Sequence, residues 1–141
     1  MPKITSKMIG DAGEHYLVSQ LMFHGIPAYK MPDNWPNYDI RAVRKNGDDV
    51  SISVKTRTWQ KRLSSPWFEF NVDDEFDYIA CIIAMLDQPH RIWIIPKGAL
   101  DKYARKNKEG SKHSKVRWVT FNDLNNKMDL SKYENNYVLI K

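Results

Sequence analysis

The sequence predicts a mixed α/β fold in which a central β-sheet is flanked by helices. Three features support this: an apolar stripe at helical spacing near the start, two strands joined by an Asn-Gly turn, and a nearly continuous apolar run further along. Elements in this order pack as a sheet covered by helices. The 141 residues are the length of one domain, so we expect a single domain over residues 1–141.

The first element is a helix over about residues 6–24. A largely apolar stripe at helical spacing is formed by Ile9, Ala12, Gly13, Tyr16, Leu17, Gln20 and Leu21. Gly25 suits the end of this helix, because glycine readily adopts the backbone conformation that follows a last helical turn. A short strand over about 27–30 should follow, and then an irregular loop rich in Pro and Asn.

The second feature is a β-hairpin. Strands over 38–44 and 50–57 flank Asn46-Gly47, a strong hairpin signal. Because side chains alternate along a strand, one face of the second strand carries Val50, Ile52 and Val54 and the other carries Ser51, Ser53, Lys55 and Arg57. The turn puts Asp39 opposite Val54, and a bulge or a one-residue slip brings Asp39 beside Ser53 or Lys55.

The third feature, residues 78–86, is apolar on both faces and predicts a buried central strand. The remaining predictions are strands over 67–72, 91–95 and 116–121, helices over 97–106 and 122–127, and a packed C-terminal Tyr-Val-Leu-Ile segment.

Composition narrows the function classes. The single cysteine, Cys81, excludes an internal disulfide and fits a reducing compartment. Neither a signal region nor a stretch of about 18 to 20 apolar residues is present, so we expect a cytoplasmic protein without membrane contact. The absence of a Gly-rich phosphate loop argues against nucleotide hydrolysis of the P-loop kind.

Charge is segregated along the chain, whose net charge is +5. Residues 102–117 hold seven Lys and Arg against one acid, and residues 41–62 hold seven against two. This segregation is typical of a phosphate-facing surface, and an ordinary solvated surface is the alternative.

The residues that could carry chemistry come from the first helix and the hairpin. Glu14 lies at the margin of the helical stripe, Asp39 lies at the start of one strand, and Ser53 and Lys55 share one face of its partner. Carboxylates and an ammonium group at one strand end can bind a metal ion and a phosphate together. Each also has an ordinary alternative: Glu14 as a surface charge, Asp39 as a turn cap and Lys55 as a solvated lysine.

The segments GDAGEHYLVSQLMFHG, NYDIRAV, SISVKTR and RIWIIPKGAL, from about Gly10 to Leu100, together resemble the PD-(D/E)XK nuclease superfamily, and most closely its small stand-alone, Holliday-junction-resolvase-like members. The resemblance implies an αβββαβ restriction-endonuclease-like core and hydrolysis of phosphodiester bonds in DNA with Mg²⁺ or Mn²⁺. By the same resemblance, Asp39 matches the metal-binding Asp and Glu14 the metal-supporting acid of the first helix. Lys55 matches the Lys that orients the attacking water or stabilises developing charge.

One position departs from that pattern. The superfamily places an acid, or sometimes Gln, two residues before the Lys, and this chain has Ser53 there. Two hypotheses therefore stand: a metal-dependent endonuclease with a weaker metal site, or a degenerate protein that binds nucleic acid or a protein partner without cleavage. The expected phosphate contacts are Arg57, Lys61, Arg62, Lys112 and Lys115. A homodimer is expected only by analogy with relatives of this size.

Overall fold

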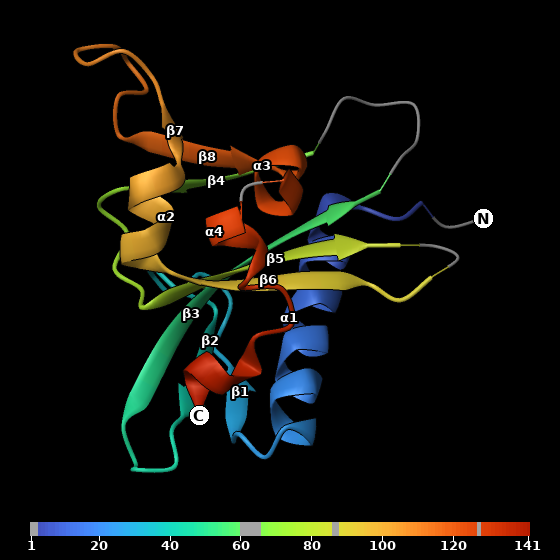
Figure 1. The fold of residues 1–141 in the computed structure, drawn as a ribbon. Coiled ribbons are helices and arrows are strands. Elements are labelled where there is room, and N and C mark those ends of the chain that lie inside the picture. Colours follow the sequence, from blue (N-terminus) through green and yellow to red (C-terminus); the bar gives the residue numbers. More distant parts are fainter. Residues whose placement is uncertain (1–2, 60–65, 86–87, 127) are drawn as a thin grey trace.

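A five-stranded mixed sheet forms the centre of the computed structural model, which describes residues 3–59, 66–85, 88–126 and 128–141 (Figure 1). Its strands, in spatial order, are β1 (Ala28–Lys30), β2 (Ile40–Val43), β3 (Asp49–Thr58), β5 (Tyr78–Ala84) and β6 (Arg91–Pro96). The pairs β1–β2, β2–β3 and β5–β6 are antiparallel, and β3–β5 is parallel. The predicted mixed sheet with a central buried strand is confirmed.

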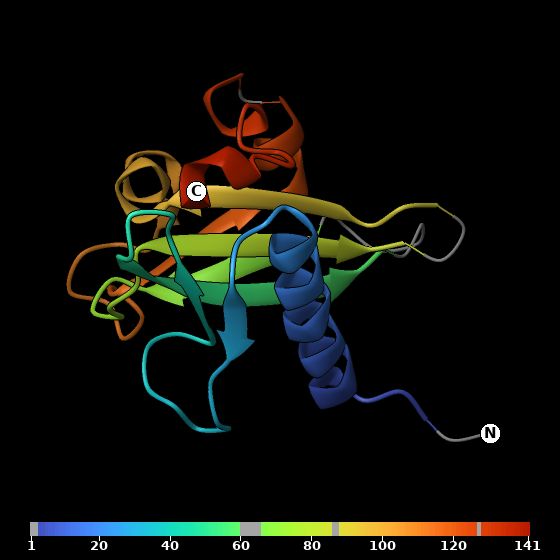
Figure 2. The same cartoon turned by 90° about the horizontal axis from the view of Figure 1, so that it is seen from below.

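A second, antiparallel sheet has the order β4 (Trp67–Asn71), β8 (Val116–Thr120) and β7 (Arg105–Lys106). The short helical elements of the C-terminal half are α2 (Lys97–Tyr103), α3 (Phe121–Asn126), α4 (Met128–Ser131) and the 3₁₀ turn η1 (Tyr137–Ile140). Figure 2 shows the central sheet between α1 (Ser6–Phe23) on one side and α2 to α4 on the other.

Helix α1 forms as its sequence predicts. The side chain of Thr5 caps it by accepting a hydrogen bond from the Met8 backbone N–H at 3.2 Å. Leu17 and Leu21 are completely buried against the sheet. Gly25, with a φ of +79°, ends the helix in a conformation that other residues rarely adopt.

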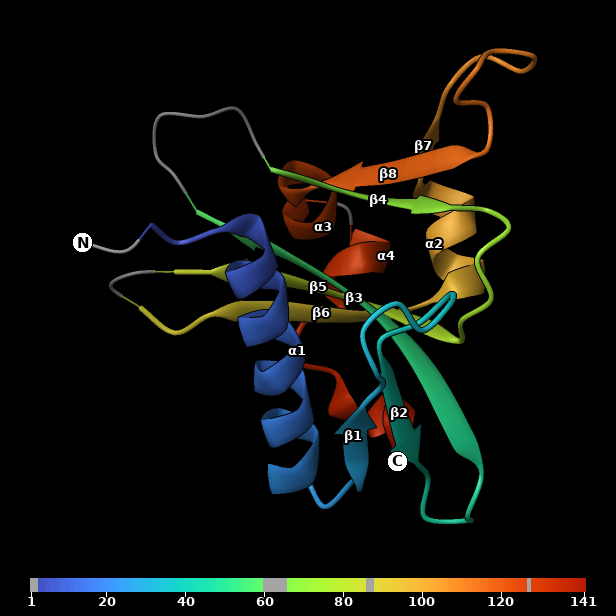
Figure 3. The same cartoon turned by 180° about the vertical axis from the view of Figure 1, so that it is seen from behind.

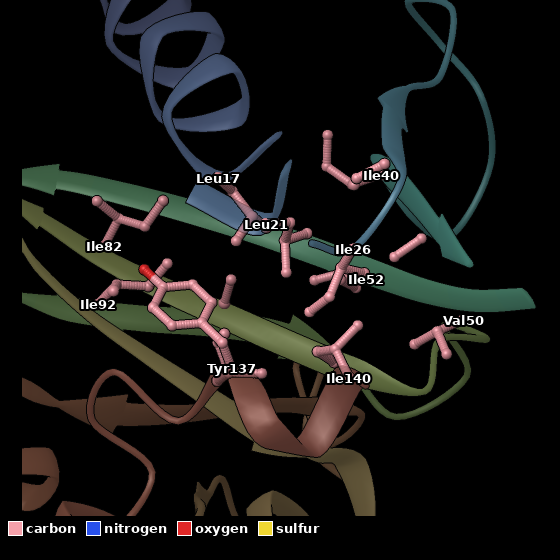
Figure 4. Packing of buried hydrophobic residues seen from close by; sticks show 14 residues of the cluster. Leu17, Leu21, Ile26, Ile40, Val50, Ile52, Ile82, Ile92, Tyr137 and Ile140 are labelled. Atoms are coloured by element: carbon pink, nitrogen blue, oxygen red, sulfur yellow. The ribbon is translucent and has the colours of Figure 1, made fainter. Parts of the chain in front are cut away.

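Two hydrophobic cores lie on opposite faces of the central sheet. The core under α1 is drawn in Figure 4 and includes Leu17, Leu21, Ile26, Ile40, Val50, Ile52, Ile82, Ile92, Tyr137 and Ile140. The second core lies under the small sheet and α2, and includes Phe68, Phe70, Ile79, Cys81, Ile83, Trp93, Ile95 and Leu100. Because β5 supplies side chains to both cores, its sequence is apolar at almost every position.

One departure from expectation in the C-terminal half concerns helix α2. The helix predicted over 97–106 ends at Tyr103, because Ala104 is extended and the next two residues pair with β8 as strand β7. Arg105 also donates two hydrogen bonds of 2.9 Å to the carboxylate of Asp123. Tertiary pairing therefore overrides the local helical pattern. The packed tail is confirmed, since Tyr137 and Ile140 are buried.

Candidate functional site

The site begins with a close approach between helix α1 and strand β3. A Cβ atom added to Gly13 would lie 1.8 Å from Oγ1 and 2.8 Å from Cβ of Thr56, so only glycine permits this separation. Glu14, the next residue, is therefore carried by the part of α1 that lies nearest to β3. Figures 2 and 3 show that α1 and the connection from β1 to β2, residues 31–39, project to the same side of the central sheet.

Asp39 is the last residue of that connection and is fixed to the backbone of β3. Its own N–H donates to the carbonyl oxygen of Ile52 at 3.0 Å, and its Oδ2 accepts from the N–H of Val54 at 2.8 Å. The strands pair Ile40 with Ile52, one residue away from the simplest expected register. Continued to the next pair, this register places Ser53 opposite Asp39, which corresponds to the one-residue slip anticipated from the sequence.

The two predicted metal ligands, Glu14 and Asp39, are brought together. The pKa of the Glu14 carboxyl is raised, first because burial disfavours its charged form and second because the negative charge of Asp39 lies beside it. The Lys30 ammonium acts in the opposite direction. The side chain of Glu14 is only 16% exposed, so these interactions are weakly screened by solvent.

Lys30 is a site residue that the sequence did not reveal. Its Nζ lies 3.1 Å from Asp11 Oδ1, 3.3 Å from Glu14 Oε2 and 3.8 Å from Asp33 Oδ1. The pKa of Lys30 is raised, chiefly by the hydrogen bond to Asp11, while burial acts in the opposite direction. A lysine at the end of a three-residue strand carries no motif, and only the pairing of β1 with β2 brings it to the site.

Ser53 and Lys55 share one face of β3, as strand alternation predicts, and helix α1 covers the opposite face. Ser53 is 5% exposed, and Lys55 is paired in register with Cys81, a residue of the second core. Among the ion pairs of the described residues, none joins Lys55 to Glu14 or Asp39.

The paired part of β2 nevertheless stops at Ile40, opposite Ile52, whereas β3 continues to Thr58. Beyond Ile52 this border of β3 is therefore not covered by a β2 strand. Side chains on either face of β3 can turn toward such a border. The carboxylate of Asp39 does so already, by accepting the Val54 N–H.

The predicted phosphate contacts differ in how freely they could bind. Arg57 donates to the Trp67 carbonyl at 3.0 Å, and its guanidinium lies over Phe68. Lys115 pairs with Asp73 at 2.8 Å, and Lys112 is exposed. Lys61 and Arg62 lie outside the described residues.

The carboxylates offer a limited fit to a divalent cation. Among the described residues, no cluster of three or more His, Cys, Asp and Glu side chains could hold a metal ion. Two adjacent carboxylates nevertheless suit hard cations such as Mg²⁺, which keep several waters and take their remaining ligands from a phosphate. Within the described part of the chain no helix has the length and apolar character needed to cross a bilayer.

Helix α1 lies on one face of a mixed sheet with the strand order β1-β2-β3-β5-β6, and this arrangement matches the restriction-endonuclease-like fold that the sequence predicts. The structure is similar to the bacterial homing endonuclease I-Ssp6803I, with a TM-score of 0.69 and 12% identity over 97% of this chain and 93% of that one. It is also similar to Hjc, a Holliday junction resolvase from the archaeal hyperthermophile Archaeoglobus fulgidus. That match has a TM-score of 0.51 and 16% identity over 79% of this chain and 84% of the resolvase.

No protein-family model and no curated protein sequence matches the chain. At these low identities the two structural similarities establish the fold. The resemblance inferred from the short motifs is thereby confirmed at the level of the nuclease-like fold.

Proposed function

We propose that the protein is a metal-dependent endonuclease that hydrolyses phosphodiester bonds in DNA. The observation that carries this proposal is the adjacency of the Glu14 and Asp39 carboxylates in a partly buried position, where burial first and the negative charge of Asp39 second raise the pKa of Glu14. Two mutually destabilising negative charges in a partly buried position are typical of a site that binds a cation. The fold adds support, because both structures described above are DNA-processing proteins by name.

In this proposal Glu14 and Asp39 hold Mg²⁺ or Mn²⁺. The bound ion would polarise the scissile phosphate and lower the pKa of a coordinated water. The Val54 N–H fixes the orientation of Asp39, because it occupies Oδ2 and leaves Oδ1 for the ion. Lys55, beyond the paired part of β2, would reach around the border of β3 to orient the water or stabilise charge on the phosphate.

The proposed partner is DNA, held through phosphates by exposed basic residues such as Lys112. A homodimer is part of the proposal, because one site cuts one strand. Phosphate contacts do not read the base sequence of the DNA. Because they are electrostatic, they make DNA binding strongly dependent on the salt concentration.

A second candidate function is nucleic-acid binding without cleavage on the same fold. Ser53 favours it: the side chain is neutral and 5% exposed, and it stands where the superfamily pattern has a further metal ligand. Lys55 also forms no ion pair with either carboxylate among the described residues.

A plasmid-nicking assay with Mg²⁺ or Mn²⁺ separates the two functions. Cleavage should be lost in Glu14→Gln, Asp39→Asn and Lys55→Met and retained in Asp101→Asn, because Asp101 is an exposed acid of α2. Salt-sensitive DNA binding without nicking in the unmodified protein would establish the second function instead. Nicking that persists in Asp39→Asn would exclude the proposed site.

A further inference from the structure

Lys30 contacts one of the two proposed metal ligands directly. Its Nζ lies 3.3 Å from Glu14 Oε2, and the two side chains are 23% and 16% exposed. Within the described ion pairs, Lys30 is the cation that reaches Glu14. The ammonium group therefore occupies one of the two carboxylate oxygens that Glu14 could offer to a metal ion.

Lys30 also belongs to a wider network of charges. It contacts Asp11 and Asp33, which are both contacted from the solvent side by the 68% exposed Lys7. Asp11 and Asp33 give Lys30 two alternative acceptors within 4 Å. Lys30 can therefore leave Glu14 and remain paired, because an ammonium group has three donors and no fixed geometry.

We propose that Lys30 is a built-in competitor of the divalent cation: it neutralises Glu14 in the metal-free protein and thereby weakens metal binding. The inference rests on the proposed function, since it assumes that Glu14 and Asp39 hold the ion. The Lys30 ammonium at Glu14 lowers the electrostatic attraction that the carboxylate pair exerts on a divalent cation. To bind Oε2 of Glu14, the divalent cation must also displace the ammonium group. With Lys30 in place, the site should therefore bind a divalent cation more weakly than its two carboxylates alone would.

Calorimetric titration with Mn²⁺ alone tests this directly on the full chain. Lys30→Met keeps the aliphatic length and removes the charge. It should bind Mn²⁺ at least about tenfold more tightly than the unmodified protein, because the Lys30 charge repels a divalent ion twice as strongly as it would repel a single charge, even where water screens the interaction. Lys7→Met is the matched control, because Lys7 contacts Asp11 and Asp33 but not Glu14. Its affinity should stay within about twofold, as expected for an exposed and screened charge.

A thermal readout provides an independent check. Without metal, Lys30→Met should melt at a lower temperature than the unmodified protein, because Glu14 then lies beside Asp39 without a counter-ion. Saturating Mn²⁺ should raise the melting temperature of Lys30→Met back to that of the unmodified protein. It should not do so in the double variant Lys30→Met, Asp39→Asn. Lys30→Gln serves as the second neutral variant if Lys30→Met does not fold.

The failures of the inference and of the proposed function have different signatures. Equal or weaker Mn²⁺ binding in Lys30→Met, together with binding in the unmodified protein that Asp39→Asn abolishes, overturns the competitor role and leaves the metal site in place. No Mn²⁺ binding in the unmodified protein or in either neutral variant overturns both. Binding that appears only when the charge of Lys30 is removed supports the inference in its strongest form.

Discussion

Replacing Gly13 by Ala tests the contact that sets the distance between helix α1 and strand β3. The new Cβ would lie 1.8 Å from Oγ1 and 2.8 Å from Cβ of Thr56. Rotation of the Thr56 side chain can move Oγ1 away, but its Cβ is fixed by the strand backbone. The helix must therefore move outward, and Glu14 moves with it.

The expected cost follows from two opposing effects. Overpacking of this kind destabilises by about 1–3 kcal/mol, and the gain in helix propensity from Gly to Ala offsets up to about 1 kcal/mol. A net loss of about 1–2 kcal/mol lowers the melting temperature of a protein this size by about 3–8 °C. Because the displaced helix separates Glu14 from Asp39, Gly13→Ala should also lose stabilisation by Mg²⁺.

Gly10→Ala is the matched control on the same helix. Nothing lies within 4 Å of a Cβ built at Gly10, so this variant should gain about 0.5–1 kcal/mol. Urea and thermal unfolding followed by circular dichroism measure both variants. In Gly13→Ala, the added change Thr56→Ala should recover part of the loss, since it removes Oγ1 and keeps Cβ. Equal stability of Gly13→Ala and Gly10→Ala would refute the close approach.

Three further predictions concern single residues. Glu14→Gln should raise the stability at pH 7 by about 0.5–2 kcal/mol while abolishing Mg²⁺-dependent stabilisation. The pKa of Glu14 in the folded protein is raised above its ordinary 4.5, so ionisation of Glu14 destabilises the fold once the pH rises above 4.5. Below pH 4.5 the carboxyl is protonated in both the folded and the unfolded protein, and thermal melts should show no advantage of Gln. Burial raises the pKa of the Cys81 thiol to about 12, so a thiol reagent at pH 8 should label it only in denaturant, and rapid native labelling would contradict its burial. Ser53→Glu should increase nicking in Mn²⁺ if the scaffold is competent, and unchanged activity with intact folding would show that a third acid is not what limits the site.

The spacing of apolar residues and one turn motif predicted the helices and strands whose formation depends on local sequence. The apolar stripe around Leu17 gave α1, the Asn46-Gly47 turn gave the hairpin, and the uninterrupted apolar run gave β5 as a strand buried on both faces. Alternation also assigned the two faces of β3 correctly, because Val50, Ile52 and Val54 all belong to the core under α1.

Features that depend on long-range packing were not accessible in this way. The alternation of side chains along β3 does not specify which of its faces helix α1 covers. The position of Lys55 on the face opposite Glu14 was therefore not predicted. The salt bridge between Lys30 and Glu14 depends on the pairing of β1 with β2, which no local signal specifies. Strand β7 was missed because two residues of backbone pairing with β8 leave no sequence period.

The hydrogen bond from Val54 to Asp39 gives one aspartate two tasks, since the same carboxylate holds a long connection onto the sheet and is a proposed ligand of the ion. Loss of activity in an alanine variant would mix these tasks, because removing the acceptor also removes one of the two hydrogen bonds that hold Asp39 to β3. Asparagine retains an oxygen for the Val54 N–H and removes only the charge. Comparing the melting temperatures of the two variants would separate the mechanical contribution of Asp39 from its chemical one.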